Sequence, residues 1–392
     1  MSLFSGAIPP GSDAGASVTT GNEYPKITAF GDLRANGVRF ARYLKERKGL
    51  DLQLVLRSGI DEYWAYSLSR PLDVTAPWVH VVKRPDGSFL SLIKYLGRMR
   101  RLSRNHPVLW GRSGGGIVSF LLGRTNIMQT VGSDVADIAY HQAWLRLLVL
   151  LSLKYARLIL ASQIRHLPIL SALKTPHVFL PLPVWSPPNT RNMETARPPG
   201  FDLVFFTSAH MYWNGIREIP KGNDRFLHAF ARFVRSTSNR VCLIAVEHGP
   251  DIHKARRLIT KLGIHDHVFF KKPLTQAELA RHYFCCDVVV DNFLCGEPGL
   301  LSLDAMAYGL PVMAYLDRNA ANMAYGKDTP PVINVSTPEE IFDALMRLLS
   351  TPYRRDVGLS SKEWVARNHH PELASDIFLS ALKSTFSHST PP

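Results

Sequence analysis

The chain has 392 residues, of which 46% are hydrophobic and 20% are charged, so it can form packed cores and is not a disordered polymer. Its length predicts about two domains. Its longest apolar run, residues 144–153, is interrupted by Arg146 and is too short for a transmembrane helix.

The chain begins with a segment that predicts a disordered tail, because residues 1–22 are small, polar and rich in Gly and Pro and lack the pattern of a signal peptide. Residues 26–30 and 52–56 predict strands, with an amphipathic helix at 38–48 between them. The loop before that helix holds Asn36 and Gly37, whose backbone N–H groups could bind phosphate. It lacks the full Gly-x-Gly-x-x-Gly pattern, so a plain turn explains it equally well.

A third strand at residues 78–82 is followed by a helix candidate at 91–104 that is both basic and amphipathic. Leu92, Ile93, Leu96 and Met99 share one side, and Lys94, Arg98, Arg100, Arg101 and Arg104 crowd the rest. Such a helix can lie on anionic lipid, although surface helices with several arginines are common.

Two further strands, at residues 108–110 and 127–131, end in loops at 111–116 and 132–134. Open α/β sheets bind ligands at the carboxyl ends of their strands, so Asp134 and, on the following helix, His141 are candidates for the acceptor side of a site. An N-cap is the simpler role for Asp134, and a lone His is more often structural. Strands at 157–161 and 177–180 complete this half, and the proline-rich residues 182–200 predict a linker.

The second half repeats the alternation of strands and helices. Thr275 with Glu278, and Thr337 with Glu340, have the spacing of capping boxes at helix starts. Strands are predicted at 202–206, 241–246, 268–270, 287–290, 311–315 and 332–335, and helices at 223–235, 252–262, 300–307, 354–367 and 372–386, besides those that Thr275 and Thr337 begin. The alternation predicts an α/β protein with two doubly wound Rossmann-like domains facing a cleft.

Charge divides unequally between the halves. Residues 1–200 carry 25 Lys and Arg against 12 Asp and Glu, a net charge of +13, whereas residues 201–392 carry 21 against 20, a net charge of +1. A basic half favours an anionic membrane surface, a polyanionic glycan or lipid, or nucleic acid. Generic surface charge that aids solubility is the alternative.

Cysteines occur only in the second half, at Cys242, Cys285, Cys286 and Cys295, without metal-type spacing to histidines. We therefore expect them to be reduced and buried, as in a cytosolic protein, and we expect no metal site.

The most informative stretch is residues 286–315, which read as strand, loop, helix and strand. The loop around Gly299 presents backbone N–H groups at a helix start, which favours an anion. Glu297 and Asp304 lie seven residues apart, nearly two helical turns, so both carboxylates could face sugar hydroxyls. A nucleotide-sugar site would have this composition. An ordinary βαβ unit with a solvated Glu is the plainer reading.

From about residue 200 to 387 the chain resembles the C-terminal half of retaining GT-B glycosyltransferases of group 1, of the family-four type. The resemblance rests on four segments in order. They are Lys221-Gly222-Asn223-Asp224, like the family's lysine-glycine helix start; Glu247-His248-Gly249-Pro250, like its strand-end turn; residues 275–290, like the helix and strand before the donor loop; and residues 299–312, like its signature helix. The first half resembles the family only in layout.

The chain departs from the family pattern at three places. The family usually pairs two glutamates with seven residues between them, whereas here the second is Asp304 and Glu297 is one place out of register. The Asp291-Asn292 pair looks like a subgroup that lacks the first glutamate. Where the family commonly has an Arg before the lysine, this chain has His210, with Arg217 as a replacement.

The resemblance implies a donor diphosphate held by Lys221, an Arg partner and the backbone of Gly299, Leu300 and Leu301. It implies that Asp304 binds the ribose hydroxyls. The donor-binding residues expected on this basis are Ser208, His210, Lys221, Glu247, Gly249, Gly299, Leu300, Leu301 and Asp304, and the catalytic ones are Lys221, Arg217, Asp304 and Glu297. The phosphate or acceptor side is assigned Asn36, Gly37, Asp134 and His141.

The resemblance, together with these residues, implies a metal-independent, retaining transferase that moves sugar from a nucleotide-diphosphate sugar to a glycan or lipid-linked acceptor in cell-surface polysaccharide or glycolipid synthesis. We expect no cofactor, a cytoplasmic location and peripheral attachment to the inner face of the membrane. The expected domains are an acceptor domain at 23–198, a donor domain at 199–365 and a helix at 366–392 that packs back on the first domain.

Two alternatives stay open. One is a non-catalytic glycosyltransferase-like protein that binds nucleotide or glycan as an assembly partner. The other is a nucleic-acid-binding α/β protein, but the chain shows no aromatic-basic binding module, so we expect no nucleic-acid partner.

Overall fold

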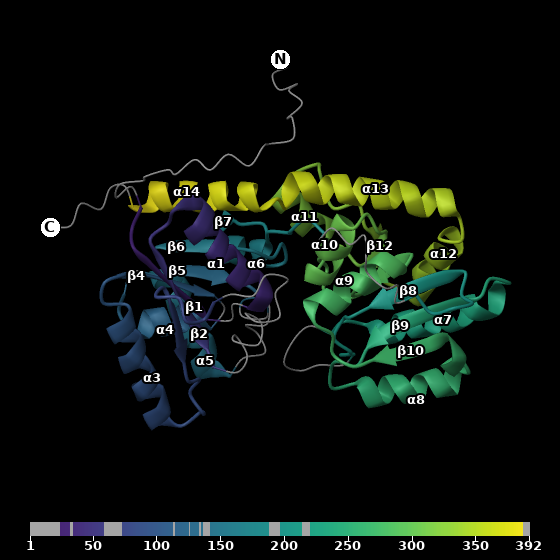
Figure 1. Cartoon of the computed structure of the whole chain (residues 1–392), viewed down its shortest axis with the longest axis horizontal. Helices are drawn as coiled ribbons and strands as arrows, with labels where there is room; N and C mark the ends of the chain where they lie inside the picture. Colours follow the sequence, from purple (N-terminus) through teal and green to yellow (C-terminus); the bar gives the residue numbers. More distant parts are fainter. Residues whose placement is uncertain are drawn as a thin grey trace, which may run out of the picture.

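The computed structural model describes residues 24–386 apart from residues 32–33, 59–72, 113, 125, 133–134, 136–141, 188–196 and 214–219. Two parallel α/β domains lie side by side, and a pair of long helices runs along one edge of both (Figure 1). The predicted α/β class with two doubly wound sheets is confirmed.

The first domain is built on a parallel sheet whose described strands have the order β3-β2-β1-β4-β5-β6-β7. Its strands are short, and those between the two edge strands are buried on both faces, which explains their nearly continuous apolar sequences. Their bounds are β1 (Ile27–Gly31), β2 (Leu52–Arg57), β3 (Val79–Val82), β4 (Val108–Arg112), β5 (Asn126–Thr130), β6 (Leu158–Ala161) and β7 (Val178–Phe179).

Helices cover both faces of this sheet. On one face, α1 (Arg34–Lys48) and α14 (Pro371–Phe386) pack into a common apolar core. On the other face lie α3 (Phe89–Leu102), α4 (Gly115–Leu121), α5 (Ala143–Tyr155) and α6 (His166–Ala172). In Figure 1, α14 lies above the first sheet, and α3, α4 and α5 lie below it.

The second domain has a parallel sheet of order β10-β9-β8-β11-β12-β13. Its strands are β8 (Leu203–Thr207), β9 (Val241–Val246), β10 (Val268–Lys271), β11 (Val288–Val290), β12 (Val312–Ala314) and β13 (Ile333–Asn334). Its helices are α7 (Asn223–Ser236), α8 (Ile252–Leu262), the 3-10 turn η2 (His265–His267), α9 (Gln276–Cys285), α10 (Leu300–Ala307), α11 (Arg318–Tyr325), α12 (Pro338–Arg347) and α13 (Thr351–Asn368). Both predicted capping boxes, at α9 and α12, are present.

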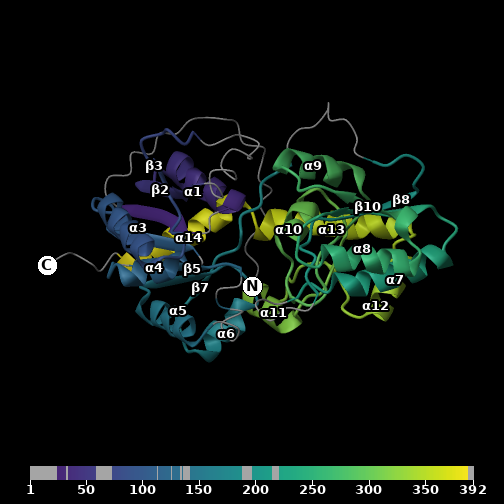
Figure 2. The same ribbon diagram turned by 90° about the horizontal axis from the view of Figure 1, so that it is seen from below.

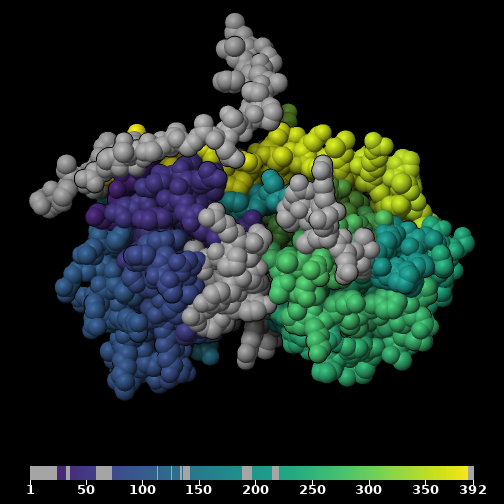
Figure 3. Space-filling model, in the orientation of Figure 1, coloured from purple at the N-terminus to yellow at the C-terminus, as the bar shows by residue number. Residues whose placement is uncertain are grey.

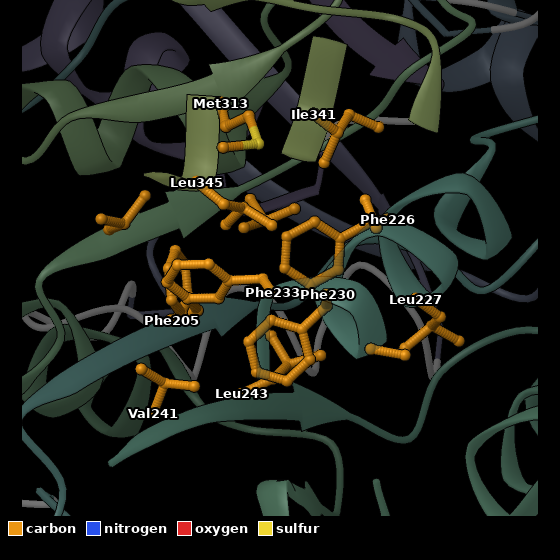
Figure 4. Packing of buried hydrophobic residues seen from close by; sticks show 14 of the residues in the cluster. Phe205, Phe226, Leu227, Phe230, Phe233, Val241, Leu243, Met313, Ile341 and Leu345 are labelled. Atoms are coloured by element: carbon orange, nitrogen blue, oxygen red, sulfur yellow. The ribbon is translucent and has the colours of Figure 1, made fainter. Parts of the chain in front are cut away.

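Phenylalanines dominate the core under α7 (Figure 4). Phe205 of β8 meets the edges of Phe230 and Phe233, with ring centroids 5.7 and 6.1 Å apart. Edge-to-face packing of this kind stabilises one relative orientation of the rings, in addition to the stabilisation that burial provides. It fixes α7 on the sheet and thereby positions the loop that precedes α7.

The two domains are joined by α13 and α14, which form the upper edge of the molecule in Figure 3. His369, between the two helices, donates a hydrogen bond from Nδ1 to Leu182 O (2.8 Å), and its Nε2 is hydrogen-bonded to the Tyr325 hydroxyl (2.9 Å). Beyond it, Phe378 of α14 lies 4.8 Å from Trp110 between ring centroids, inside the first domain's core. The end of the chain thus contributes to the domain in which the chain begins.

The structure corrects three details. The loop expected at Asn36 and Gly37 is wrong, because α1 already begins at Arg34 and includes both residues. Helices α6 and α11 were not predicted, since they span only 7 and 8 residues and give a weak periodic signal.

Candidate functional site

The candidate site lies at the carboxyl ends of β8 and β11, neighbouring strands whose connections leave in opposite directions along the sheet. Such a switch point is where open α/β sheets bind ligands. Three segments meet there: the residues after β8, the loop that ends at Lys221, and the loop from Asp291 to the start of α10.

The start of α10 is fixed by a buried aspartate. Asp291, directly after β11, accepts hydrogen bonds from Gly299 N–H (3.1 Å) and from the Ser302 hydroxyl (2.6 Å). A Cβ at position 299 would lie 3.2 Å from the Asp291 carboxylate, so glycine permits this close approach. Leu300 and Leu301, predicted to bind phosphate through their backbone, form the first turn of α10.

Lys221 is held beside this loop by its own backbone. Its N–H donates to Tyr212 O and its carbonyl accepts from Phe293 N–H, both at 2.7 Å. Its Nζ lies 3.3 Å from Cys295 Sγ. Burial alone would lower the pKa of Lys221, but Cys295 and Asp291 outweigh it and keep this pKa above its ordinary value. Lys221 is therefore a permanent positive charge at the base of the site.

Glu297 forms a buried ion pair that crosses between the domains. Arg165, after β6 of the first domain, places its Nε 3.0 Å from Glu297 Oε1, with both side chains largely buried. Arg165 also donates from Nη2 to Gly132 O at 2.7 Å, so its guanidinium joins two loops of different domains. Burial raises the pKa of Glu297, and Arg165 and Lys221 oppose that shift.

Asp304, on the second turn of α10, faces the first domain through Arg39 of α1. Burial raises the pKa of Asp304 to about 6, against the opposing attraction of the Arg39 guanidinium. Burial likewise lowers the pKa of Arg39 to about 10. The Arg39 guanidinium also lies 4.5 Å from the centre of the Trp185 ring. Asp304 is thus a carboxylate at the domain boundary that becomes protonated when the pH falls below about 6.

The other predicted donor residues follow the carboxyl ends of β8 and β9. Ser208 follows β8 and is half-buried. The His210 ring lies 4.5 Å from that of His248 between centroids. Gly249 has φ +118°, and a Cβ there would lie 2.5 Å from Met211 O, so this turn requires glycine. Glu247 forms an ion pair with Arg256 of α8.

In the first domain, the predicted phosphate-side residues do not form a loop at the site. Asn36 donates from Nδ2 to Pro183 O at 2.7 Å, and Gly37 is buried within α1. Asn36 therefore ties α1 to the segment leaving the first domain. Asp134, His141 and Arg217 lie outside the described residues.

Three residues of the site were not assigned a role from the sequence. Asp291 directly follows β11, and Arg165 lies four residues after the end of β6. The rule that ligands lie at carboxyl ends of strands was a signal that could have found both. Arg39 lies within a helix and carries no such signal. Only the packing of the domains brings it to Asp304.

Among the described residues, no group of three or more His, Cys, Asp or Glu side chains is placed to hold a metal ion. All four cysteines are buried and none of them forms a disulfide. Cys295 belongs to the site through its contact with Lys221.

Sequence comparison places a known family on this part of the chain. Residues 216–364 match the model described as "Glycosyl transferases group 1". The second half of the chain thus matches the group 1 glycosyltransferases. The matched region begins in the loop before Lys221 and includes Glu297, α10 and Asp304.

Two curated proteins are similar to the same half. A GDP-mannose-dependent alpha-(1-6)-phosphatidylinositol monomannoside mannosyltransferase of Mycolicibacterium smegmatis is 27% identical over 161 residues, 39% of this chain and 42% of the relative. A D-inositol 3-phosphate glycosyltransferase 2 of Catenulispora acidiphila is 30% identical over 156 residues, 38% of this chain and 36% of the relative. The matches span about two fifths of these relatives' lengths.

Solved structures resemble the whole described architecture. Anabaena Alr3699/HepE in complex with UDP and glucose gives a TM-score of 0.67 at 15% identity, covering 92% of this chain and 100% of that one. Sucrose-phosphate synthase of Thermosynechococcus elongatus gives 0.67 at 14% identity, covering 93% and 100%. At such identities the likeness establishes the shared two-domain fold.

Proposed function

We propose that the protein is a glycosyltransferase that moves a sugar from a nucleotide-diphosphate sugar to a glycan or lipid-linked acceptor. The observation that carries the proposal is the placement of Lys221 beside the start of α10, within the region that matches the group 1 family. The names of similar proteins point to nucleotide sugars as donors: one relative is GDP-mannose-dependent, and one structural neighbour was solved with UDP and glucose.

The chemistry that this site would serve is the departure of a diphosphate whose negative charge grows in the transition state. Lys221 supplies a fixed positive charge, and the first turn of α10 supplies backbone N–H groups at the positive end of a helix dipole. Asp304, when ionised, can accept hydrogen bonds from two sugar hydroxyls. We infer transfer with retention and without a metal ion, and we assign no protein nucleophile.

The acceptor would approach from the first domain, which carries the positive charge. A lipid-linked or anionic glycan at the inner face of a membrane fits this charge, with the protein attached peripherally and acting in polysaccharide or glycolipid synthesis. None of the helices in the described part of the chain combines the length and apolar character needed to span a membrane.

The proposal is tested with purified full-length protein, in two steps. Thermal shift with UDP, GDP and other nucleoside diphosphates identifies the donor nucleotide, because a ligand that binds only the folded state raises the melting temperature. Radiolabelled sugar nucleotides with that base then measure transfer to membrane extracts. We expect a chelator to leave transfer unchanged.

Lys221→Ala is the decisive variant. We expect it to lower kcat by roughly a hundredfold or more, because it removes stabilisation of the leaving diphosphate. Lys261→Ala, in the last turn of α8, is the matched control and should behave like the wild type. Binding of a nucleotide without transfer, and no effect of Lys221→Ala in cells, would instead support a non-catalytic assembly protein.

A further inference from the structure

The face of the first domain formed by α3, α4 and α5 differs in composition from the rest of the surface. Residues 87–186, which include these helices, contain 12 Lys and Arg but only two acidic residues, Asp134 and Asp137. On the opposite face, Lys48 of α1 forms ion pairs with Glu372 and Asp376 of α14. Most of the excess charge of the first half therefore lies in the stretch of chain that contains α3, α4 and α5.

This basic face also exposes large apolar side chains. On α5, Trp144 is 61% exposed, Leu147 is 56% exposed and Leu150 is 38% exposed. The residues of α5 that are buried against the domain are Val149, Ser152 and Leu153. The exposed set therefore forms a separate stripe that points away from the sheet.

Neighbouring helices extend the stripe into a surface. α4 lies between α3 and α5, because its Val118 and Leu122 pack with the core under α3 while its Ile117 packs with the core under α5. Leu121 of α4 is exposed beside them, and Phe89 at the start of α3 is 78% exposed. Figure 2, seen from below, shows α3, α4 and α5 next to one another on the first domain.

Basic side chains accompany the apolar stripe on α5 and recur at α3. Arg146 and Lys154 of α5 are exposed on the same helix as Trp144 and Leu147. At the start of α3 a surface hollow of about 380 Å³ is lined by four cations, Lys83, Arg84, Lys94 and Arg98, and by one carboxylate, Asp86. This hollow lies in the first domain, on the face opposite to α1 and Arg39. An anionic phosphate group is the complementary ligand for such a hollow.

An anionic lipid bilayer can bind both the basic and the exposed apolar side chains of this face. Lys and Arg are attracted to anionic headgroups, and Trp, Phe and Leu side chains enter the boundary between headgroups and acyl chains. Nucleic acid would satisfy the cations but would leave exposed leucines without a partner. A protein partner would more often meet charges of both signs.

We propose that the α3–α4–α5 face is a membrane-docking surface, in which the α5 stripe Trp144, Leu147 and Leu150 enters an anionic bilayer and the basic side chains around it bind lipid phosphates. The basic helix at residues 91–104 that the sequence predicted as a lipid-binding element corresponds to α3 and forms only part of this surface. The inference deepens the proposed lipid-linked acceptor and rests on that proposal for its purpose, but vesicle binding is measured without any sugar transfer.

The test is cosedimentation of the full-length protein with vesicles of equal parts phosphatidylcholine and phosphatidylglycerol, and with vesicles of pure phosphatidylcholine. We expect binding to the anionic vesicles only. The triple change Trp144→Gln, Leu147→Gln and Leu150→Gln should lower the partition coefficient by roughly tenfold or more, because it removes apolar area from the bilayer. Arg146→Gln with Lys154→Gln should lower it by roughly fivefold per charge.

Matched controls distinguish docking through this face from non-specific adsorption to vesicles. Met323 and Leu359 of the second domain are as exposed as the α5 residues, so Met323→Gln with Leu359→Gln should bind like the wild type. Trp144→Phe should keep binding but reduce the blue shift of tryptophan emission that insertion causes. All variants are first compared with the wild type by circular dichroism.

Three results would overturn the proposal: no binding of the wild type to anionic vesicles, full binding of the glutamine triple variant, or an equal loss in the second-domain control. Tighter, salt-sensitive binding to RNA that the triple variant retains would also overturn it. Because these assays need no donor, a protein that docks but transfers no sugar would refute the proposed function and leave this inference standing.

Discussion

Each carboxylate near the proposed donor site has a different environment, and that environment decides its role. Asp291 is buried and caps α10 through Gly299 and Ser302. Glu297 is buried against Arg165 of the other domain. Asp304 is half-buried and faces Arg39. Among the described residues, Asp304 is the one of the three whose carboxylate has neither a hydrogen bond nor a close ion pair, which agrees with its proposed role toward sugar hydroxyls.

The Arg165–Glu297 pair allows a prediction about stability. Arg165→Met leaves a buried carboxylate without its partner and should destabilise the protein by about 3 kcal/mol, whereas Arg165→Met with Glu297→Gln should cost less than the sum of the single changes. Chemical denaturation of the four proteins measures the coupling.

The Arg197–Asp287 pair is the control, because its atoms are also 3.0 Å apart but the side chains are partly exposed and lie within the second domain. Its coupling should be about 0–1 kcal/mol. Equal coupling in the two pairs would show that burial between the domains adds nothing.

The raised pKa of Asp304 predicts a pH dependence. The pKa of Asp304 is about 6 in the folded protein, whereas in the unfolded chain it lies near the ordinary aspartate value of 3.8. Between these values the folded state binds more protons, so the contribution of Asp304 to stability falls as pH rises. Urea unfolding measures the free energy of unfolding of Asp304→Asn and of the wild type at about pH 4 and about pH 7. The difference between the two proteins should shift in favour of Asp304→Asn as the pH rises. Parallel stability curves would refute this assignment.

At the scale of elements, close contact between helices depends on two glycines. Gly358 of α13 lies against Gly309, which ends α10, and a Cβ at position 358 would lie 2.1 Å from Gly309 O. This contact lets α13 pass close beneath the helix that carries Asp304. The spacing of residues predicted both helices, but it contained no sign that they touch.

Alanine substitution tests the contact. Gly358→Ala should destabilise the protein by about 1–3 kcal/mol, because the backbone must move to admit a methyl group. Gly97→Ala, inside α3 with nothing within 4 Å of its Cβ position, should instead stabilise by about 0.5–1 kcal/mol through helix propensity. Thermal unfolding of both variants gives the comparison, and a stable Gly358→Ala protein would contradict it.

At the scale of the whole molecule, the two domains are not independent along the chain. α14 belongs to the core of the first domain although it follows the second domain in sequence. His369, before α14, is buried between Leu182 O and Tyr325, and burial lowers its pKa to about 4. The chain therefore crosses between the domains twice, at residues 182–200 and at His369.

Loss of α14 should therefore unfold the first domain. Phe378→Ala removes a fully buried ring that touches Trp110 and Phe40, and should cost about 3–5 kcal/mol. Leu373→Ala on the same helix is the control, because Leu373 is exposed and should change stability little. Calorimetry measures the unfolding transition of each variant. The transition whose midpoint Phe378→Ala lowers should be the one that substitutions in α1 also lower.

The sequence by itself determined the alternation of strands and helices, the capping boxes at Thr275 and Thr337, and the stretch from Asp291 to Asp304 as the centre of a site. These features are local, because apolar periodicity, turn residues and caps act within a few residues of chain. Only the tertiary structure decided that Asn36 donates a hydrogen bond to Pro183 O, that Glu297 forms an ion pair with Arg165, and that Asp304 lies close enough to Arg39 for their charges to interact. Those contacts join residues more than a hundred positions apart, and they arise from packing two domains together, for which a single sequence contains no periodic signal.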